Sequence, residues 1–487
     1  LKNFDVASVV SPRACNRCPT GNLHLLYSLL RLWRAIFLGV GFLQSRLLTL
    51  GWTRNFRHFC SARIGRERDM SSMKIAKSFD YRDIWLGIAI LWIVFFHSKI
   101  SVPSSILMSL KNLGYGGVDI CLFASGIGCY YSLSKDDDIV RFFRRRLFRI
   151  IPTYWCVLIP WTIYVIFTRG IPWPAILGNL FCIQDLTNRG NGFNWYLSVL
   201  LILYILAPSM KAIVARINSW KTFLLSTFFL ILLSFPFWHS DSYIIIATRI
   251  PIFFIGMYCA KLGQSEVCLS KMMIIVSAIS LISGLLILKY FTGRFPNYMW
   301  SCGLWWYPFI LITPGMCLAI SALFHFLSFV KSARILAKIL TVVGGYSFEI
   351  YLLHIFFFNV LDNYVLARGT VENRNVYWLG TILLILPGCY ILRKSQEIIM
   401  KFVWPGKSQW TLMWFLALGI DILFGLHSGA QNLSLPCRRP QRKDRRSRRP
   451  SSGWRTKKLS SLAFWHLAIY NINMWRRPGA VPSSNYR

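Results

Sequence analysis

The chain has 487 residues, of which 55% are hydrophobic, 16% are aromatic and only 15% are charged. Soluble globular proteins carry about a quarter charged residues, and disordered chains are poor in aromatic residues. This composition therefore excludes an ordinary soluble domain and a largely disordered chain. It predicts an all-α, polytopic membrane protein.

The formal net charge of +37 is concentrated at the two ends of the chain. Residues 1–72 hold 11 Lys and Arg against three acidic residues, and residues 405–487 hold 15 against two. We therefore divide the chain into an N-terminal extension at 1–72, a membrane domain at 73–404 and a basic tail at 405–487. The apolar run at 410–426 is a candidate for one additional membrane helix.

Two interpretations fit the basic tail. It is either an arm that binds nucleic acid or anionic lipid, or a disordered tail or translated sequence from outside the native protein. We favour the second interpretation and expect no nucleic-acid partner. The first methionines, Met70 and Met73, precede the organised pattern directly, so residues 1–72 also count as a candidate non-native extension.

The 13 cysteines are scattered, and many fall inside apolar runs. Cys15 and Cys18 form one CxxC pair, but no second pair or histidine cluster accompanies it, and no HExxH motif is present. We expect neither a disulfide framework nor a metal site.

Ten apolar segments in the middle of the chain have about the length of a membrane-spanning helix. If the N-terminus is cytoplasmic, the inner segments hold 20 Lys and Arg and the outer segments hold nine. This bias predicts that both ends of the chain are cytoplasmic. The ten segments lie at about 83–99, 116–134, 149–168, 195–215, 221–238, 243–262, 271–290, 301–328, 344–362 and 376–393.

Two ionisable residues lie in the outer halves of the first two segments. His97 is interpreted either as a general base or proton shuttle, or as an interfacial histidine. Asp119, in the motif GGVDI, is either the carboxylate that orients this imidazole or a helix N-cap. A base and its orienting group would lie in the same leaflet, as these two residues do in the expected topology.

A cluster of arginines precedes the third segment, in the sequence RRRLFRIIPTYW. Arg145, Arg146 and Arg149 would lie at the cytoplasmic side of the membrane. Arginine binds phosphate with two parallel hydrogen bonds, so the cluster is a candidate site for a phosphorylated donor. On charge alone, we favour the other interpretation, an ordinary inside anchor of the membrane topology.

The ninth segment, YSFEIYLLH, carries Glu349 and His354. A glutamate at this depth is expected to take part in function or in a polar network. The two residues stand about 140° apart around the helix, and Ser347, Tyr351 and His354 share one face instead. Arg249, in RIPIFFIGM, is interpreted as a site for an anionic acceptor or as an interface anchor.

Six motifs occur in order along the chain: GIAIL with the following His97, GGVDI, RRRLFRIIPTYW, WYLS, RIPIFFIGM and YSFEIYLLH. Together they make residues 80–395 resemble acyltransferase family 3, the bacterial integral-membrane O-acyltransferases. The resemblance implies transfer of an acyl group, commonly acetyl, from cytosolic acyl-CoA to a hydroxyl of an extracytoplasmic carbohydrate. It also implies a multi-pass protein of the inner (plasma) membrane that contacts lipid, a glycan acceptor and glycan-synthesis partners.

By position, His97 matches the catalytic histidine of the family, Asp119 its GVD aspartate and Glu349 its ninth-helix glutamate. Arg146 and Arg149 match its cytoplasmic RxxR element. The family usually has Arg or Lys eleven residues before the histidine, where this chain has Leu86. Arg82, one turn earlier than Leu86 and about 60° around the helix from the face of His97, is the candidate substitute.

The expected mechanism has the arginines holding the phosphates of acyl-CoA while His97 removes a proton from the acceptor hydroxyl. An acylated histidine intermediate is the alternative. Two other functions fit the composition: a secondary transporter or polysaccharide exporter with proton-relay residues in the membrane, and a non-catalytic partner of a glycan-synthesis complex.

Overall fold

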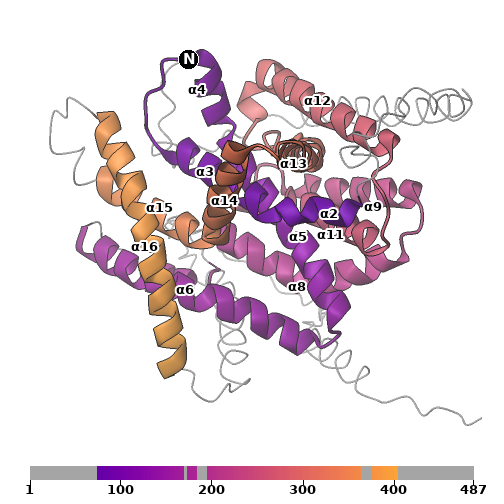
Figure 1. Cartoon of the computed structure of the whole chain (residues 1–487). Helices are drawn as coiled ribbons and strands as arrows, with labels where there is room; N and C mark the ends of the chain where they lie inside the picture. The colour runs from indigo at the N-terminus through magenta and orange to yellow at the C-terminus, as the bar shows by residue number, and fades with distance from the viewer. Residues whose placement is uncertain (1–73, 169, 171–172, 184–194, 363–373, 404–487) are drawn as a thin grey trace, which may run out of the picture. The chain divides into compact units, whose positions relative to one another are not determined.

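The computed structural model describes residues 74–403, except 169, 171–172, 184–194 and 363–373 (Figure 1). These residues belong to the predicted membrane domain. The predicted N-terminal extension, the basic tail, the segment 410–426 and the pair Cys15–Cys18 lie outside the described residues.

Regular structure in this part of the chain is helical, and a single isolated β-bridge joins Lys74 to Cys268. The principal α-helices are α2 (Ile75–Ser78), α3 (Arg82–His97), α4 (Ser105–Asn112), α5 (Gly117–Lys135), α6 (Ile139–Thr168), α7 (Trp173–Leu180), α8 (Trp195–Arg216), α9 (Trp220–Leu232), α10 (Asp241–Ala247), α11 (Ile250–Gln264), α12 (Lys271–Arg294), α13 (Phe309–Phe326), α14 (Lys331–Gly345), α15 (Ser347–Val360) and α16 (Arg374–Val403). Short 3₁₀ turns connect several of them: η2 (Phe79–Tyr81), η3 (Gly114–Gly116), η5 (Phe235–Phe237) and η6 (Pro296–Tyr298).

Each of the ten predicted membrane segments coincides with a helix, so the all-α class is confirmed. The predicted number of ten membrane spans is not confirmed. Among the described residues, seven helices are long and apolar enough to cross a membrane, or up to eight if the bent pair α14–α15 forms one span. With 16 residues, α3 is about 24 Å long and shorter than the hydrocarbon core of about 30 Å. The glycines, serines, tyrosines and Asp119 of α5 lower its apolarity.

The centre of the bundle consists of α3, α5 and α11, which pack closely because small residues meet at their crossings. A Cβ atom on Gly126 of α5 would collide with the carbonyl of Phe253, and one on Gly256 of α11 would collide with the carbonyl of Phe123. The two helices therefore meet backbone to backbone at a reciprocal pair of glycines. This contact fixes the position of α5, which contributes one wall of the candidate site.

A similar glycine contact joins α14 to α3 (Figure 1). A Cβ atom on Gly87 would strike the carbonyl of Leu340, and one on Gly344 would strike the carbonyl of Asp83. Immediately after this contact the chain bends by 70° into α15. Helix α14 is absent from the ten predicted segments, because its three basic residues give it the appearance of an inner loop.

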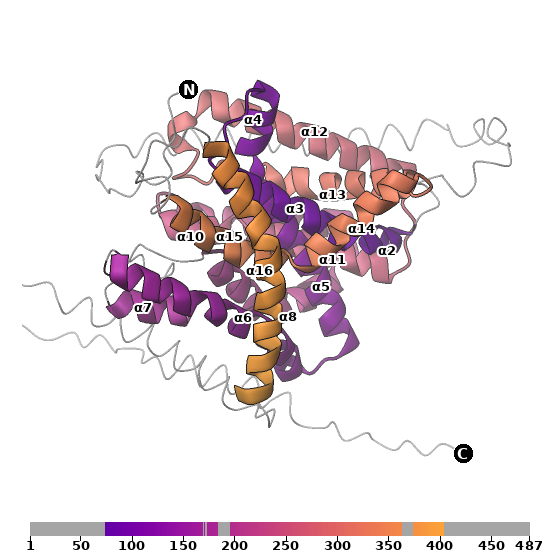
Figure 2. The ribbon, with the colours of Figure 1, turned by 60° about the vertical axis from the view of Figure 1, so that its left-hand side comes forward.

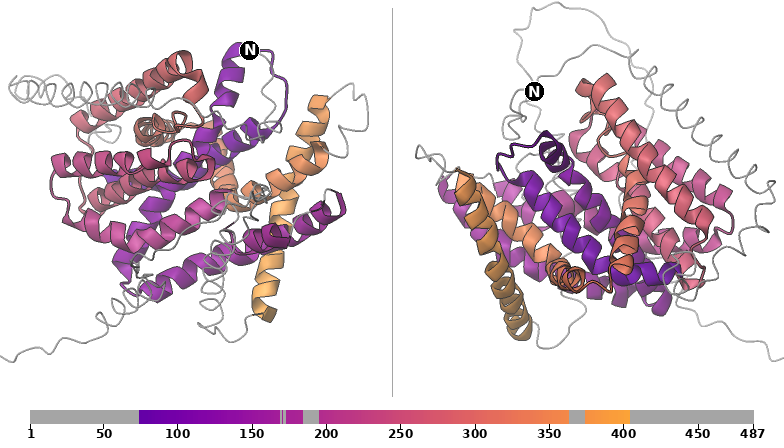
Figure 3. Two further views of the ribbon diagram at one scale, coloured as in Figure 1. Left: turned by 180° about the vertical axis from the view of Figure 1, so that it is seen from behind. Right: turned by 45° about the horizontal axis from the view of Figure 1, so that its top comes forward.

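The outer helices present apolar side chains to the surroundings. In the spans Trp220–Phe237 and Lys271–Arg294, only 11% of the residues in the most apolar window are buried, against 72% in Tyr243–Gln264. α12 lies against α13 at the side of the bundle (Figure 3). Exposed apolar helix faces of this extent are stable in lipid and not in water. The chain is therefore a multi-pass membrane protein.

The remaining helices enclose the site. α16 crosses both α6 and α15 (Figure 2), and α15 also contacts α3. α8 packs against α5 and α11. Five helices from distant parts of the sequence, α3, α5, α6, α8 and α15, thereby surround one internal space.

Candidate active site

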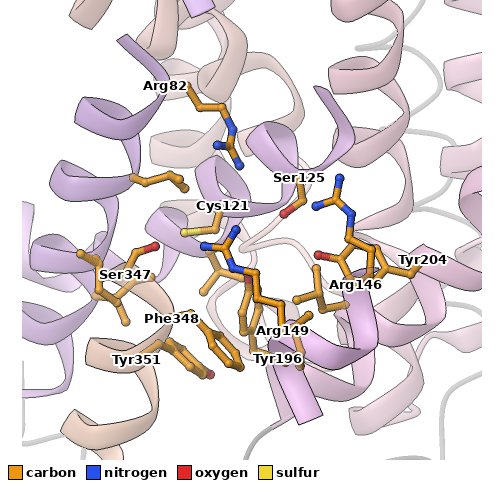
Figure 4. Close-up of a pocket in the computed structure, with 16 residues that line it drawn as sticks. Arg82, Cys121, Ser125, Arg146, Arg149, Tyr196, Tyr204, Ser347, Phe348 and Tyr351 are labelled. Atoms are coloured by element: carbon orange, nitrogen blue, oxygen red, sulfur yellow. The ribbon is translucent and has the colours of Figure 1, made fainter. Parts of the chain in front are cut away.

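A pocket lies between α3, α5, α6, α8 and α15 (Figure 4). It holds about 750 Å³ of space free of protein atoms, part of which is open to solvent. Its lining combines basic, phenolic and apolar side chains: Arg82, Leu86, Ile90, Ile93, Val118, Cys121, Ser125, Arg146, Arg149, Ile150, Tyr196, Leu200, Tyr204, Ser347, Phe348 and Tyr351. We call the part lined by Arg82, Arg146 and Arg149 the arginine end. We call the neighbouring pair His97 and His354, which lies just outside the lining, the histidine end.

The arginine end is formed by Arg82 from the start of α3 and by Arg146 and Arg149 from α6, which reach into the same space (Figure 4). Arg146 donates a 2.8 Å hydrogen bond to the carbonyl of Gly128, and its guanidinium lies 5.5 Å from the ring centre of Tyr204. Arg82 has a weak ion pair, with 3.6 Å between Nη1 and Oδ1 of the half-exposed Asp83. These contacts orient the guanidinium groups and leave donor N–H groups available for an anion.

The neighbouring acidic residues do not neutralise Arg146 or Arg149. Asp136 pairs with Arg141 at 3.2 Å and with Arg145 at 3.5 Å, and Asp137 pairs with Lys211 at 3.1 Å. The hydrogen bond from the backbone amide of Asp138, assisted by Arg141 and Arg145, keeps the pKa of the Asp136 carboxyl below its ordinary value. In the described part of the chain, Arg146 and Arg149 have no carboxylate partner.

Arg145 is therefore separated from the other three predicted arginines. It is exposed, and besides Asp136 it contacts the hydroxyl of Ser132 at 3.5 Å. Arg146 and Arg149 are three residues apart and therefore share one face of α6. Arg145 is four residues before Arg149, so helical spacing alone does not separate it, and its ion pair with Asp136 engages it instead.

Leu86 and Arg82 both line the pocket, at successive turns of α3. Leu86 forms part of the apolar wall, and the Nε atom of Arg82 lies 3.4 Å from the carbonyl oxygen of Ala124. The expected substitution by Arg82 thus places a third cation beside Arg146 and Arg149, one turn below the usual family position.

The middle of the pocket is apolar and phenolic. Tyr196 of α8 and Tyr351 of α15 are buried, and their ring centres lie 4.8 Å apart. Ile90 and Ile93 of α3 and Val118 of α5 line the same region. A slender, flexible chain fits such a wall better than a hydrated sugar does, because the wall offers few hydrogen-bonding groups.

The histidine end lies next to two lining residues of the pocket, Ile93 and Tyr351. The carbonyl oxygen of Ile93 lies 3.0 Å from Nδ1 of His97, and the ring of Tyr351 lies 5.4 Å from the ring of His354. The two histidines face each other across α3 and α15, with 3.2 Å between Nδ1 of His97 and Nε2 of His354. His97 is exposed, whereas His354 is completely buried.

Asp119 does not have the predicted role of orienting His97. It lies in the first turn of α5, where its Oδ1 atom is 3.8 Å from Nε of Arg249, and both side chains are buried. The guanidinium of Arg249 also lies 4.4 Å from the ring of Trp306 and 5.3 Å from that of Trp195. Asp119 is not an N-cap either, because Gly116 occupies that position. It belongs to a buried ion pair between α5 and α11, as the cost of an unpaired charge requires.

Glu349 also faces away from the pocket, toward α16. Its Oε1 atom accepts a 2.8 Å hydrogen bond from Nε of Arg393, and Arg393 additionally bonds the carbonyl of Gly345 and covers the ring of Tyr346 at 3.7 Å. This network joins α15 to α16. The expectation that Glu349 takes part in a polar network fits these surroundings, in which its partner is Arg393.

His354 and Tyr351 are site residues that received no role from the sequence alone. The signal was present, because Ser347, Tyr351 and His354 follow one another at helical spacing. Ser347 and Tyr351 line the pocket, and His354 continues the same face to His97. Only the partner of this face, the end of α3, was not recognisable from the sequence.

One of the comparisons with known proteins identifies a family. A family model described as an acyltransferase domain matches residues 80–394, which include all five helices around the pocket. Neither the curated proteins nor the solved structures contain a significant match to the chain. The chain therefore belongs to acyltransferase family 3.

Proposed function

We propose that this protein transfers an acyl group, most simply acetyl, from acyl-CoA to a hydroxyl group of an extracytoplasmic carbohydrate. The observation that carries the proposal is one pocket with three arginines at one end and a histidine pair just beyond the other. A phosphate-binding site joined to a proton acceptor is the arrangement that acyl transfer from a phosphorylated thioester needs.

The donor would bind with its phosphates at Arg82, Arg146 and Arg149. Their guanidinium groups supply two-pronged hydrogen bonds. Asp136 and Asp137 are engaged with other cations, and Arg82 has only a weak ion pair with Asp83. The apolar wall of Leu86, Ile90 and Ile93 would hold the slender arm that carries the thioester. The excess of Lys and Arg on one side of the predicted topology supports entry of this donor from the cytoplasm of a cell whose inner membrane holds the protein.

The reaction would take place at the histidine end. His97 removes the proton from the acceptor hydroxyl, whose oxygen attacks the thioester carbonyl carbon. The carbon–sulfur bond then breaks, and the thiolate takes up the proton from His97, so that the products are an oxygen ester and free CoA. General base catalysis of this kind contributes about 10²- to 10⁴-fold to a rate.

Acylation of a cell-surface glycan tests this proposal. Bacterial cells express the full chain or its His97→Ala variant at equal membrane abundance, and mild base releases esters from the glycan before mass spectrometry. We expect a base-labile acyl mass with the wild type and none with the variant. Equal acylation by both proteins would exclude His97 as the base, and appearance of unmodified glycan outside the cell without an ester would favour an exporter.

A further inference from the structure

His354 is a buried polar residue that the proposed chemistry leaves without a task. It lies on α15 with no exposed surface, beside the proposed base. Its two ring nitrogens have different neighbours: Nδ1 is 3.1 Å from the carbonyl oxygen of Ile350, and Nε2 is 3.2 Å from Nδ1 of His97. A buried imidazole with both nitrogens engaged has a defined hydrogen-bonding pattern, which can be worked out from the acceptors around it.

The carbonyl of Ile350 fixes the proton on His354. A carbonyl oxygen can only accept, so Nδ1 of His354 must carry the hydrogen that it donates to Ile350. In the neutral imidazole, Nε2 then has a lone pair and no hydrogen. That lone pair is directed at Nδ1 of His97.

The same argument then fixes the proton on His97. Its Nδ1 atom faces two acceptors, the carbonyl of Ile93 at 3.0 Å and the lone pair of His354 at 3.2 Å. Nδ1 of His97 therefore carries the hydrogen and shares it between them, as three-centre hydrogen bonds do. The unprotonated nitrogen of His97 is Nε2, which is the nitrogen that a general base needs.

Aromatic rings hold His354 in place. Tyr351 and Phe358 contact its ring with centres 5.4 Å and 5.7 Å away, and Trp378 of α16 supports Phe358 at 4.7 Å. This packing restricts rotation of the completely buried imidazole. The bond from His97 is thus made to a rigid acceptor.

We infer that His354 is a positioning residue, which orients His97 and stabilises the imidazolium formed when Nε2 accepts the proton of the acceptor hydroxyl. The inference rests on the proposed function. The carbonyl of Ile93 belongs to the same helix as His97 and moves with it, whereas His354 ties the base to α15, whose Ser347 and Tyr351 line the pocket. When His97 is protonated, its Nδ1–H still donates to His354. Nε2 of His354 therefore acts only as an acceptor and never carries a proton.

Three substitutions of the full chain test this role. His354→Gln places a carbonyl oxygen near the former Nε2 and preserves an acceptor for His97. His354→Asn preserves only the polar atoms near the former Nδ1, beside Ile350, and His354→Leu preserves neither. We expect the kcat of acyl transfer to fall about tenfold or more for Asn and Leu, to recover substantially for Gln, and the KM for acyl-CoA to stay within about twofold in all three.

A merely structural role gives a different result. It predicts that the His354→Gln and His354→Asn variants are equally active at equal amounts of folded protein. That outcome, or an effect confined to the KM for acyl-CoA, would overturn the inference. If the Leu variant does not fold, the comparison of Gln with Asn decides the matter alone.

A second measurement separates this inference from the proposed function. Diethyl pyrocarbonate modifies unprotonated imidazole nitrogens, and mass spectrometry of the His97 peptide reports the rate in a membrane preparation at a pH of about 8, without any acyl transfer. We expect slower modification of His97 in the Asn variant than in the wild type and recovery in the Gln variant. Equal modification rates of His97 in all three proteins would overturn the inference. If the rates differ as expected but the wild type transfers no acyl group, the proposed function alone is refuted.

Discussion

The arginine end and the histidine end differ in charge and in hydrogen bonding. At the arginine end, three cations share one space; Arg82 has a weak ion pair with Asp83, whereas Asp136 and Asp137 pair with Arg141, Arg145 and Lys211 and leave Arg146 and Arg149 without a carboxylate partner among the described residues. At the histidine end, two imidazoles satisfy each other and two backbone carbonyls through hydrogen bonds between neutral groups.

This difference indicates that the two ends have separate roles, one in binding and one in proton transfer. Positive charge without a carboxylate partner is unfavourable unless an anion binds beside it. The arginine end is therefore suited to binding the phosphates of the donor. A neutral, hydrogen-bonded histidine is suited to accepting a proton, because its free nitrogen is fixed before the substrate arrives. We therefore expect substitutions at the two ends to have separate kinetic consequences.

The largest effect is expected at the histidine end. His97→Ala should lower kcat by about 10²-fold or more, because the general base is lost, while the KM for acyl-CoA changes little. Steady-state kinetics of the purified, reconstituted protein measures both constants. A raised KM with an unchanged kcat would place His97 in donor binding and abolish the contrast between the two ends.

The next largest effect is expected at the arginine end. Arg149→Gln should raise the KM for acyl-CoA about tenfold or more and change kcat less, because a hydrogen bond to a charged group contributes about 1.5–3 kcal/mol. Arg145→Gln is the matched control, since Arg145 is four residues away and pairs with Asp136. Equal effects of the two substitutions would mean that only the general positive charge of α6 matters.

Two neighbouring glycines at the end of α14 test how this helix packs on α3. Gly344→Ala should destabilise the protein by about 1–3 kcal/mol, because its Cβ would collide with the backbone of α3. Gly345→Ala is the control, since its Cβ would meet no heavy atom within 4 Å. Thermal unfolding in detergent measures both variants, and similar melting temperatures would show that α14 does not pack on α3 as described.

The smallest effect is expected at Glu349. Glu349→Gln should lower stability by about 1 kcal/mol, because the half-exposed Arg393 loses a charged partner and can turn to solvent. The kcat per folded molecule should stay near that of the wild type. A large loss of kcat in a protein of normal stability would return Glu349 to the chemistry and would require a link from α16 to the histidine end.

Much of this molecule can be predicted from the sequence by physical argument. The apolar runs predicted each principal span, and the face shared by Ser347, Tyr351 and His354 predicted how α15 presents its side chains. Spacing along one helix is local information and can be worked out from helical geometry alone.

Pairings between distant helices could not be predicted in the same way. The partner of Asp119 is Arg249, 130 positions further along the chain, and the partner of His97 is His354. Both depend on which helices touch, which the glycine crossings decide through contacts that a single sequence does not identify. The same limit explains the omission of α14, a helix that packs on α3 through glycine contacts although its sequence resembles a basic loop.

The structure of the full chain with a non-hydrolysable acyl-CoA analogue, determined by electron cryo-microscopy, tests the central claim most directly. We predict density for the phosphates within hydrogen-bonding distance of Arg82, Arg146 and Arg149. We also predict that the thioester analogue lies beside Ile93 and Tyr351, within reach of Nε2 of His97. Phosphate density at another group of cations, or an acyl group that ends far from His97, would contradict the claim.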